Sequence, residues 1–274
     1  MKPTKKDITL LSLDHPGAND LTYRKRRKFI ADKADAFLEN PTLFPRIRYN
    51  KKERETWHTV LKNLAPLHAH HASSTYLDAK EKLKLTKQEI PQLYELSERL
   101  QKLNNFQVEP IGGLVDVRWF LGSLGRRIMI STQYLRHHSR PDYTPEPDMI
   151  HEVVGHIPMF VNQDFAHFSE RLGKAALKAS KQQLRHIETL YWFTVEFGLI
   201  KERGVVKAFG AGLLSSFGEM PHAFSKHVTR KPFSVEEIIK TPYVYTEMQK
   251  TLFVIPSFSV LQKETEKFLR REGL

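Results

Sequence analysis

Apolar side chains recur at helical spacing along most of this 274-residue chain, and this pattern limits the fold more than any other feature. The helical stretches are roughly residues 20–38, 51–71, 162–179, 182–202, 207–220 and 258–272. A proline at position 66 is expected to interrupt the second of them. The segments typical of a strand or hairpin are 107–113, 127–135 and 244–256. The sequence therefore predicts a mainly α fold with minor β structure.

Local capping signals predict where some of the helices begin. Thr86 and Glu89 have the spacing of a capping box, and Ser234 and Glu237 repeat it. Thr144 precedes a proline in "TPEPD" and is a candidate cap for a helix that starts there.

We expect a single main domain over residues 12–260. A basic segment, 1–11, precedes it, and a short charged helix, 261–274, follows it. No internal repeat or low-complexity linker divides the chain.

The chain contains no cysteine and carries a formal net charge of +12. The lack of cysteine excludes disulfides, thiolate zinc sites and a cysteine nucleophile, and it fits a reducing compartment. No stretch approaches the ~20 apolar residues of a membrane span, and the early run "ITLLSL" is too short for a signal peptide. We therefore expect a cytoplasmic protein with no membrane partner.

The densest basic run is "YRKRRKF", residues 23–29. It lies in a helical stretch that has Phe29, Ile30, Ala34 and Phe37 on its other side. A solvated helix face is the favoured interpretation, and no nucleic-acid module accompanies the run. A basic nucleic-acid-binding protein stays as the non-enzyme alternative.

The stretch "PDMIHEVVGHIPMF" carries the first candidate site residues, His151 and His156. In an H-E-x-x-H zinc protease the histidines are four residues apart and share one helix face. Here they are five apart, which on a continuous α-helix separates them by about 140°. Gly155 and Pro158 both favour a helix end, so a break at Gly155 would let His156 turn back toward His151.

Glu196 lies in "YWFTVEFGLI", a helical pattern that is apolar all round. A buried carboxylate is costly unless a cation or a metal accompanies it. Together with two imidazoles it makes a 2-His-1-carboxylate set, which suits non-haem Fe(II). Zinc hydrolysis with the same ligands, a buried hydrogen-bonded histidine pair, and a Glu196 paired with Arg or Lys remain alternatives.

Other histidine groups are interpreted as incidental. The cluster at His68, His70 and His71 and the pair His137 and His138 are expected to be exposed and to bind metal only adventitiously.

The segments "RPDYTPEPDMIHEVVGHIPMF", "YWFTVEFGL" and "FGAGLLSSFGE", in this order, resemble the tetrahydropterin-dependent aromatic amino acid hydroxylases. The resemblance extends to "DHPGANDLTYRKRRKFIAD" and covers roughly residues 12 to 260. Within the family it is closest to bacterial phenylalanine 4-hydroxylases. It implies one mainly α catalytic domain around a central iron, as a monomer or homodimer without the animal regulatory domain and tetramerisation arm.

The resemblance also assigns roles to individual residues. The implied iron ligands are His151, His156 and Glu196. Glu152 and Tyr191 are implied as catalytic residues near the iron. The implied substrate-binding residues are Arg136, which holds the carboxylate, with Thr144, Pro147, Trp192, Phe197 and Ser215. Phe120 is expected to stack on the pterin, and Val115 to offer only backbone groups beside it.

The implied reaction converts L-phenylalanine to L-tyrosine with O2 and a reduced tetrahydropterin, tetrahydrobiopterin or a related compound. The pterin supplies two electrons, one oxygen atom goes to the pterin carbon, and the other goes to the para carbon of the phenyl ring. Tyrosine and tryptophan hydroxylation are the alternatives within the family, and a zinc-dependent hydrolase with Glu152 as base is the alternative outside it.

Overall fold

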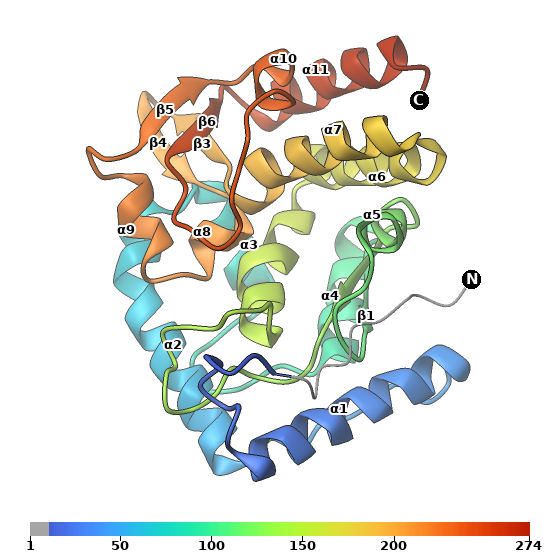
Figure 1. Ribbon diagram of the computed structural model, residues 1–274, viewed down its shortest axis with the longest axis vertical. Coiled ribbons are helices and arrows are strands. Elements are labelled where there is room, and N and C mark those ends of the chain that lie inside the picture. Colours follow the sequence, from blue (N-terminus) through green and yellow to red (C-terminus); the bar gives the residue numbers. More distant parts are fainter. Residues whose placement is uncertain (1–10) are drawn as a thin grey trace.

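The computed structural model describes residues 11–274, so the expected basic segment 1–11 lies almost wholly outside the described residues. Helices dominate the fold, and two small sheets complete it (Figure 1). The α-helices are α1 Leu21–Glu39, α2 Lys51–His71, α3 Ser74–Lys82, α4 Leu93–Asn104, α5 Val117–Leu124, α6 Gln163–Lys178, α7 Lys181–Tyr191, α8 Ala211–Leu214, α9 Glu219–Ala223, α10 Val235–Ile238 and α11 Phe258–Arg271. Three further helical segments are the π-helix η1 His151–His156, the 3-10 helix η2 Ile157–Val161 and the π-helix η3 Trp192–Glu196.

The strands form one parallel pair and one mixed sheet. Strands β1 Gln107–Pro110 and β2 Ile128–Ser131 pair in parallel, where the sequence predicts strands. The second sheet has the order β4-β3-β6-β5. Its strands are β3 Leu199–Glu202, β4 Val205–Ala208, β5 Thr229–Pro232 and β6 Thr251–Ile255.

The hairpin of β3 and β4 corrects the predicted helices 182–202 and 207–220. Its two turn residues, Arg203 and Gly204, both have positive φ, as a tight two-residue hairpin requires. The chain therefore leaves the helical conformation directly after Glu196 and enters a strand at Leu199. The apolar residues of this segment were compatible with either helix or strand, and the "RG" turn was the missed signal.

Two helices begin at residues other than those predicted. Helix α4 begins at Leu93 rather than near Thr86, because Pro91 disfavours a helical residue before it. Thr144 does not cap a helix: its hydroxyl donates to the carbonyl of Glu146 at 2.7 Å. The acceptor at the true helix start is Asp148, whose Oδ1 accepts from the backbone N–H of His151 at 3.1 Å.

Two other local predictions have mixed outcomes. Helix α2 continues through Pro66, which lies on its exposed side, so water can solvate the carbonyl that loses its N–H partner. Ser234 does cap α10 by accepting from the backbone N–H of Glu237 at 3.3 Å.

The basic run of α1 is less solvated than predicted. Arg27 is only 1% exposed, forms an ion pair with Glu146 and lies over the ring of Tyr134. Arg26 pairs with Glu53, with Nε 2.7 Å from a carboxylate oxygen. Phe29, expected on the apolar side, is instead half exposed. Two arginines of the run therefore connect α1 to the rest of the domain.

The segment η1–η2 lies in the middle of the fold (Figure 1). The apolar side chains of Val153, Val154 and Ile157 are fully buried there. Helix α8 packs directly on η1, and α6 packs on both α5 and α11. The C-terminal helix α11 thus contributes buried residues such as Leu261 and Phe268 to the main core.

Gly155 is required by close packing rather than by a helix end. A Cβ at this position would lie 2.7 Å from the carbonyl oxygen of Ala211 and 3.0 Å from its Cβ, so η1 and α8 can approach only because position 155 is glycine.

We expect Gly155→Ala to lower the free energy of unfolding by about 1–3 kcal/mol, because the added methyl overpacks a backbone contact. The control is Gly218→Ala, whose Cβ would meet only the mobile end of Met248. Urea unfolding of both variants measures the difference. Equal stability of the two variants would contradict the packing explanation.

Candidate metal centre and its cavity

The two histidines face each other because η1 is a π-helix. In a π-helix the backbone bonds run from residue i to i+5, and in η1 the N–H of Ile157 bonds the carbonyl of Glu152. Residues five apart therefore lie one above the other, which an α-helix achieves for residues four apart. The expected break at Gly155 is absent, since the helical segment continues through His156. The wider turn of the π-helix is therefore what allows two histidines five residues apart to face each other.

Glu196 arrives at the same point from a second π-helix. In η3 the N–H of Phe197 bonds the carbonyl of Trp192 at 2.9 Å, again five residues back. Glu196 Oε1 lies 3.1 Å from His156 Nε2, and its Oε2 lies 3.5 Å from His151 Nε2. The two Nε2 atoms are 3.0 Å apart. Within the described residues, the ion-pair partners found for Glu196 are these histidines, not an arginine or a lysine.

Electrostatics in this cluster follow from burial and mutual contact. Burial lowers the pKa of His151 to about 4, although Glu196 opposes the shift. Burial would also lower the pKa of His156, but the Glu196 carboxylate outweighs it and the net shift is upward. Burial acts to raise the pKa of Glu196, yet His156 and His151 hold it below its usual value. The set thus offers an ionised carboxylate and a neutral imidazole, as a metal site requires.

The ring of His151 is oriented by Ser215 of the segment after α8. The Ser215 hydroxyl donates to the carbonyl of Ala211 at 2.7 Å, so it can only accept from His151 Nδ1, 3.0 Å away. This arrangement places the proton on Nδ1 and leaves the lone pair on Nε2 toward Glu196. Fixing the tautomer through the other ring nitrogen is typical of histidine metal ligands.

Arg136 is held by a buried bidentate pair with Asp148. Its Nε lies 3.0 Å from Oδ2 and its Nη2 lies 2.9 Å from Oδ1, and both side chains are buried. Arg136 lowers the pKa of Asp148 despite complete burial. Because Asp148 also accepts from the N–H of His151, the pair connects the Arg136 loop to the first turn of η1.

A cavity of about 340 Å³ opens beside the cluster. Its lining is mostly apolar and aromatic and includes residues from α5, η1, α7 and the loop before β6. Of the residues singled out in the sequence, the lining contains Val115, Phe120, Pro147, His151, Glu152, His156, Tyr191, Trp192 and Glu196. Phe120 lies on helix α5, edge-on to Tyr191 with ring centroids 5.6 Å apart.

Four of the candidate substrate residues are not among the residues that line this cavity. Phe197 packs against Trp192, with ring centroids 4.7 Å apart. Ser215 contacts His151 from the far side of the ring, as described above. Arg136 and Thr144 contact Asp148 and Glu146, respectively. These residues therefore do not share the cavity wall with the cluster.

Four buried polar atoms of the lining residues have no hydrogen-bond partner among residues 11–274, and two of them suit a bound polar molecule. Glu152 Oε2 and Tyr191 Oη are buried and have no hydrogen-bond partner in the described part of the chain. Burial raises the pKa of Glu152 to about 8, with a smaller contribution from Glu196, and raises that of Tyr191 further above its ordinary value. Unpaired buried polar atoms are costly, and a ligand with donors and acceptors would satisfy them.

Sequence reasoning missed some residues around the site. Asp148 was not selected, although its place three residues before His151 is the ordinary position of an N-cap. Glu188 and Tyr245 also line the cavity, and Tyr245 is 80% exposed. Tyr243, from the same loop, stacks on Trp192 with ring centroids 4.5 Å apart. No local pattern links Glu188, Tyr243 and Tyr245 to a site, because they meet the other residues only in the folded chain.

Residues 4–272 match the family of biopterin-dependent aromatic amino acid hydroxylases. The chain belongs to this family. It is 42% identical to human tyrosine 3-monooxygenase over 95% of its own length and 50% of that protein. It is 41% identical to human phenylalanine-4-hydroxylase over 94% of its own length and 58% of that protein. The chain thus spans about half of the curated relatives it matches, or slightly more.

Solved structures of bacterial members are similar in fold. The Chromobacterium violaceum phenylalanine hydroxylase with bound iron(III) and 7,8-dihydrobiopterin is 32% identical, with a TM-score of 0.77 over 82% of this chain and 83% of that one. The Legionella pneumophila phenylalanine hydroxylase is 31% identical, with a TM-score of 0.78 over 82% of this chain and 92% of that one.

Membership of this family confirms the predicted fold class. None of the helices in residues 11–274 is long and apolar enough to cross a membrane.

We expect His156→Ala and Glu196→Ala to fold but to lose most of the bound metal, because each change removes one of three converging side chains. His167→Ala, on the exposed side of α6, is the matched control. Iron content of purified protein, measured alongside a thermal melt, tests this. If either variant retains one iron per chain, the ligand assignment is wrong.

Proposed function

We propose that this chain is a phenylalanine 4-hydroxylase, which converts L-phenylalanine to L-tyrosine with O2 and a tetrahydropterin at an iron held by His151, His156 and Glu196. The observation that carries the proposal is the convergence of these three ligand atoms beside an apolar, aromatic cavity. Two imidazoles and one carboxylate leave several metal positions open, which suits iron and oxygen chemistry. The iron and dihydrobiopterin named for the Chromobacterium structure support the same choice.

The chemistry that the absent groups would supply is activation of O2 by the metal, with two electrons from the reduced pterin. The protein's own contribution is positioning and the exclusion of water. Ser215 fixes the ring of His151, and the Arg136–Asp148 pair fixes the start of η1. Pro147 and Trp192 would hold the substrate ring beside the metal.

The ends of the two organic reactants would meet different parts of the chain. Nε and Nη2 of Arg136 are occupied by Asp148, and Nη1 reaches only the carbonyl of Pro141, at 3.4 Å. We assign Nη1 to the amino-acid carboxylate, with the hydroxyls of Thr144 and Ser215 as further candidate partners of the amino acid. Phe120 on α5 offers a flat ring in the lining of the cavity, which suits the pterin, and Val115 lines the same cavity.

Phenylalanine is favoured as the substrate because the structures found similar to this chain are named phenylalanine hydroxylases. Sequence identity does not decide the question, since it is 41% to a phenylalanine hydroxylase and 42% to a tyrosine hydroxylase. Hydroxylation of tyrosine is the second candidate, because Glu188 and Tyr243 in the cavity lining could accept a hydrogen bond from the phenol hydroxyl of tyrosine.

With iron, tetrahydrobiopterin and O2 supplied, we expect kcat/KM for phenylalanine to exceed that for tyrosine roughly tenfold to a hundredfold, the range that an apolar pocket gives against an added hydroxyl. Product analysis with phenylalanine, tyrosine and tryptophan, singly and in competition, measures it. Glu196→Ala is the inactive control. A preference for tyrosine would replace the specific proposal and keep the family assignment.

We expect Phe120→Ala to raise the KM for the pterin about tenfold, because stacking is worth ~0.5–1.5 kcal/mol beyond buried area. The KM for phenylalanine should move much less. Trp119→Ala removes another aromatic ring from the same helix, outside the cavity lining, and is the matched control. Proportionate losses toward both substrates, with a lowered melting temperature, would instead make Phe120 a core residue.

A further inference from the structure

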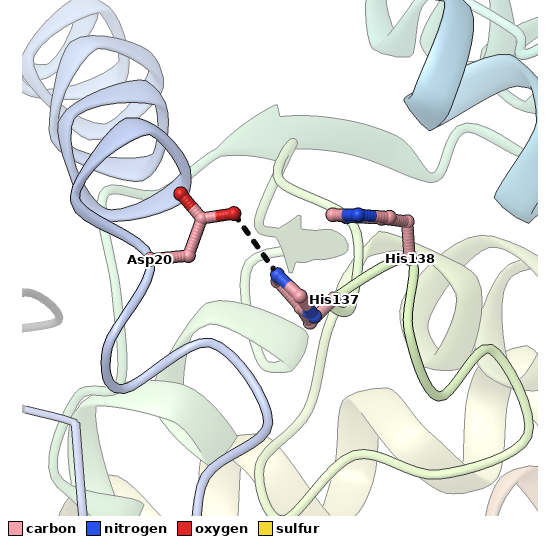
Figure 2. Close-up of side chains that lie close together, drawn as sticks. All are labelled: Asp20, His137 and His138. Atoms are coloured by element: carbon pink, nitrogen blue, oxygen red, sulfur yellow. Dashed lines mark hydrogen bonds and ion pairs between the residues drawn. The ribbon is translucent and has the colours of Figure 1, made fainter.

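A second group of metal-binding side chains lies away from the cavity. Asp20, at the start of α1, lies close to His137 and His138 of the loop that follows β2, and Figure 2 shows Asp20 bonded to His137 with the ring of His138 beside them. One ligand atom of each lies within 4.8 Å of the others, and Asp20 Oδ2 is 3.2 Å from His137 Nε2. The pair that the sequence suggested to be incidental thus gains a carboxylate from a distant segment.

Hydrogen bonds outside the cluster leave one ligand atom of Asp20 and one of His137 facing it. Asp20 uses Oδ1 to cap α1, accepting from the N–H of Tyr23 at 2.9 Å, so Oδ2 is the oxygen that faces the histidines. His137 Nδ1 accepts from the backbone N–H of Ser139 at 3.3 Å and lies 2.7 Å from its hydroxyl, so Nε2 carries the proton and donates it to Asp20 Oδ2 at 3.2 Å. A metal at Nε2 would displace this proton, and Nδ1 would then donate to the Ser139 hydroxyl.

His138 can supply the third ligand beside Asp20 and His137. His138 is exposed, so its side chain can rotate to close the remaining distance. It also lines, together with Asp20 but not His137, a small cavity of about 70 Å³ that leaves room for water beside the ion.

Positive charges around the cluster reduce the affinity that we expect this site to have for a cation. Lys52 lies close enough to lower the pKa of His138 and opposes a cation. Arg26, on the same cavity, is neutralised by Glu53. The Asp20 carboxylate is held ionised by the Tyr23 N–H and by His137, and supplies the negative charge of the site.

We propose that Asp20, His137 and His138 form a second divalent-metal site, separate from the catalytic centre, for an ion of the zinc class. Two imidazoles and one carboxylate are an ordinary zinc set, with water as the fourth ligand. The ion would join the first turn of α1 to the loop that carries Arg136.

The test is calorimetric titration of the metal-stripped full chain with Zn²⁺. We expect two binding events in the wild type, the weaker of them at this site. His138→Gln and Asp20→Asn should each weaken that event by more than about tenfold, the lower end of what loss of even an outer partner costs. Asparagine caps a helix as well as aspartate, so Asp20→Asn keeps the start of α1.

A matched control is His70→Gln, which alters another adjacent histidine pair, with ring centroids 4.5 Å apart. It should leave both events unchanged. The variant His151→Ala/His156→Ala should retain the weaker event and gain thermal stability on addition of Zn²⁺, and His138→Gln in that background should abolish both effects. A single event in the wild type, or two events that survive His138→Gln and Asp20→Asn, overturns the proposal. None of these readouts depends on hydroxylase activity.

Discussion

The carboxylate of Glu196 is a charge in an apolar interior, and much of the central structure serves to compensate this charge. An isolated buried carboxylate would be strongly destabilising, so two imidazoles converge on it and together they make a cation site. That convergence needs η1 and η3 to widen into π-helices, and it needs α8 to pack against Gly155. The central packing and the metal centre are therefore aspects of one constraint.

A chain of contacts extends this constraint outward. Asp148 caps η1 and grips Arg136, and Arg136 begins the segment that contains His137 and His138. These two histidines lie close to Asp20 at the start of α1. Arg27, also on α1, forms an ion pair with Glu146 in the loop before η1. The loop from residue 132 to 148 is thus held at both ends and along its length, although it contains no regular structure.

The sequence predicted the fold class, the long helices and the three side chains that converge at the candidate metal centre, because periodicity and ligand chemistry are local or nearly local signals. It did not predict the π-helices, since the pattern "HEVVGH" is equally compatible with a broken α-helix. The hairpin at Arg203 and Gly204 was hidden by apolar residues that suit helix and strand alike. Asp20 could not be joined to His137 from sequence, because 117 residues separate them and only the fold brings them together.

The π-turn of η1 also determines the phase of everything that follows it. An α-helix could align two histidines with one residue fewer between them, so the extra residue is not needed for the pair itself. If an ordinary α-helix kept the extra residue, His156 and every later side chain would be turned by about 100° relative to His151. Ile157 and Phe160, both fully buried, would then leave the core. The π-turn acts as a phase correction, because it absorbs the extra residue and lets one short segment keep its ligands and its core contacts in register.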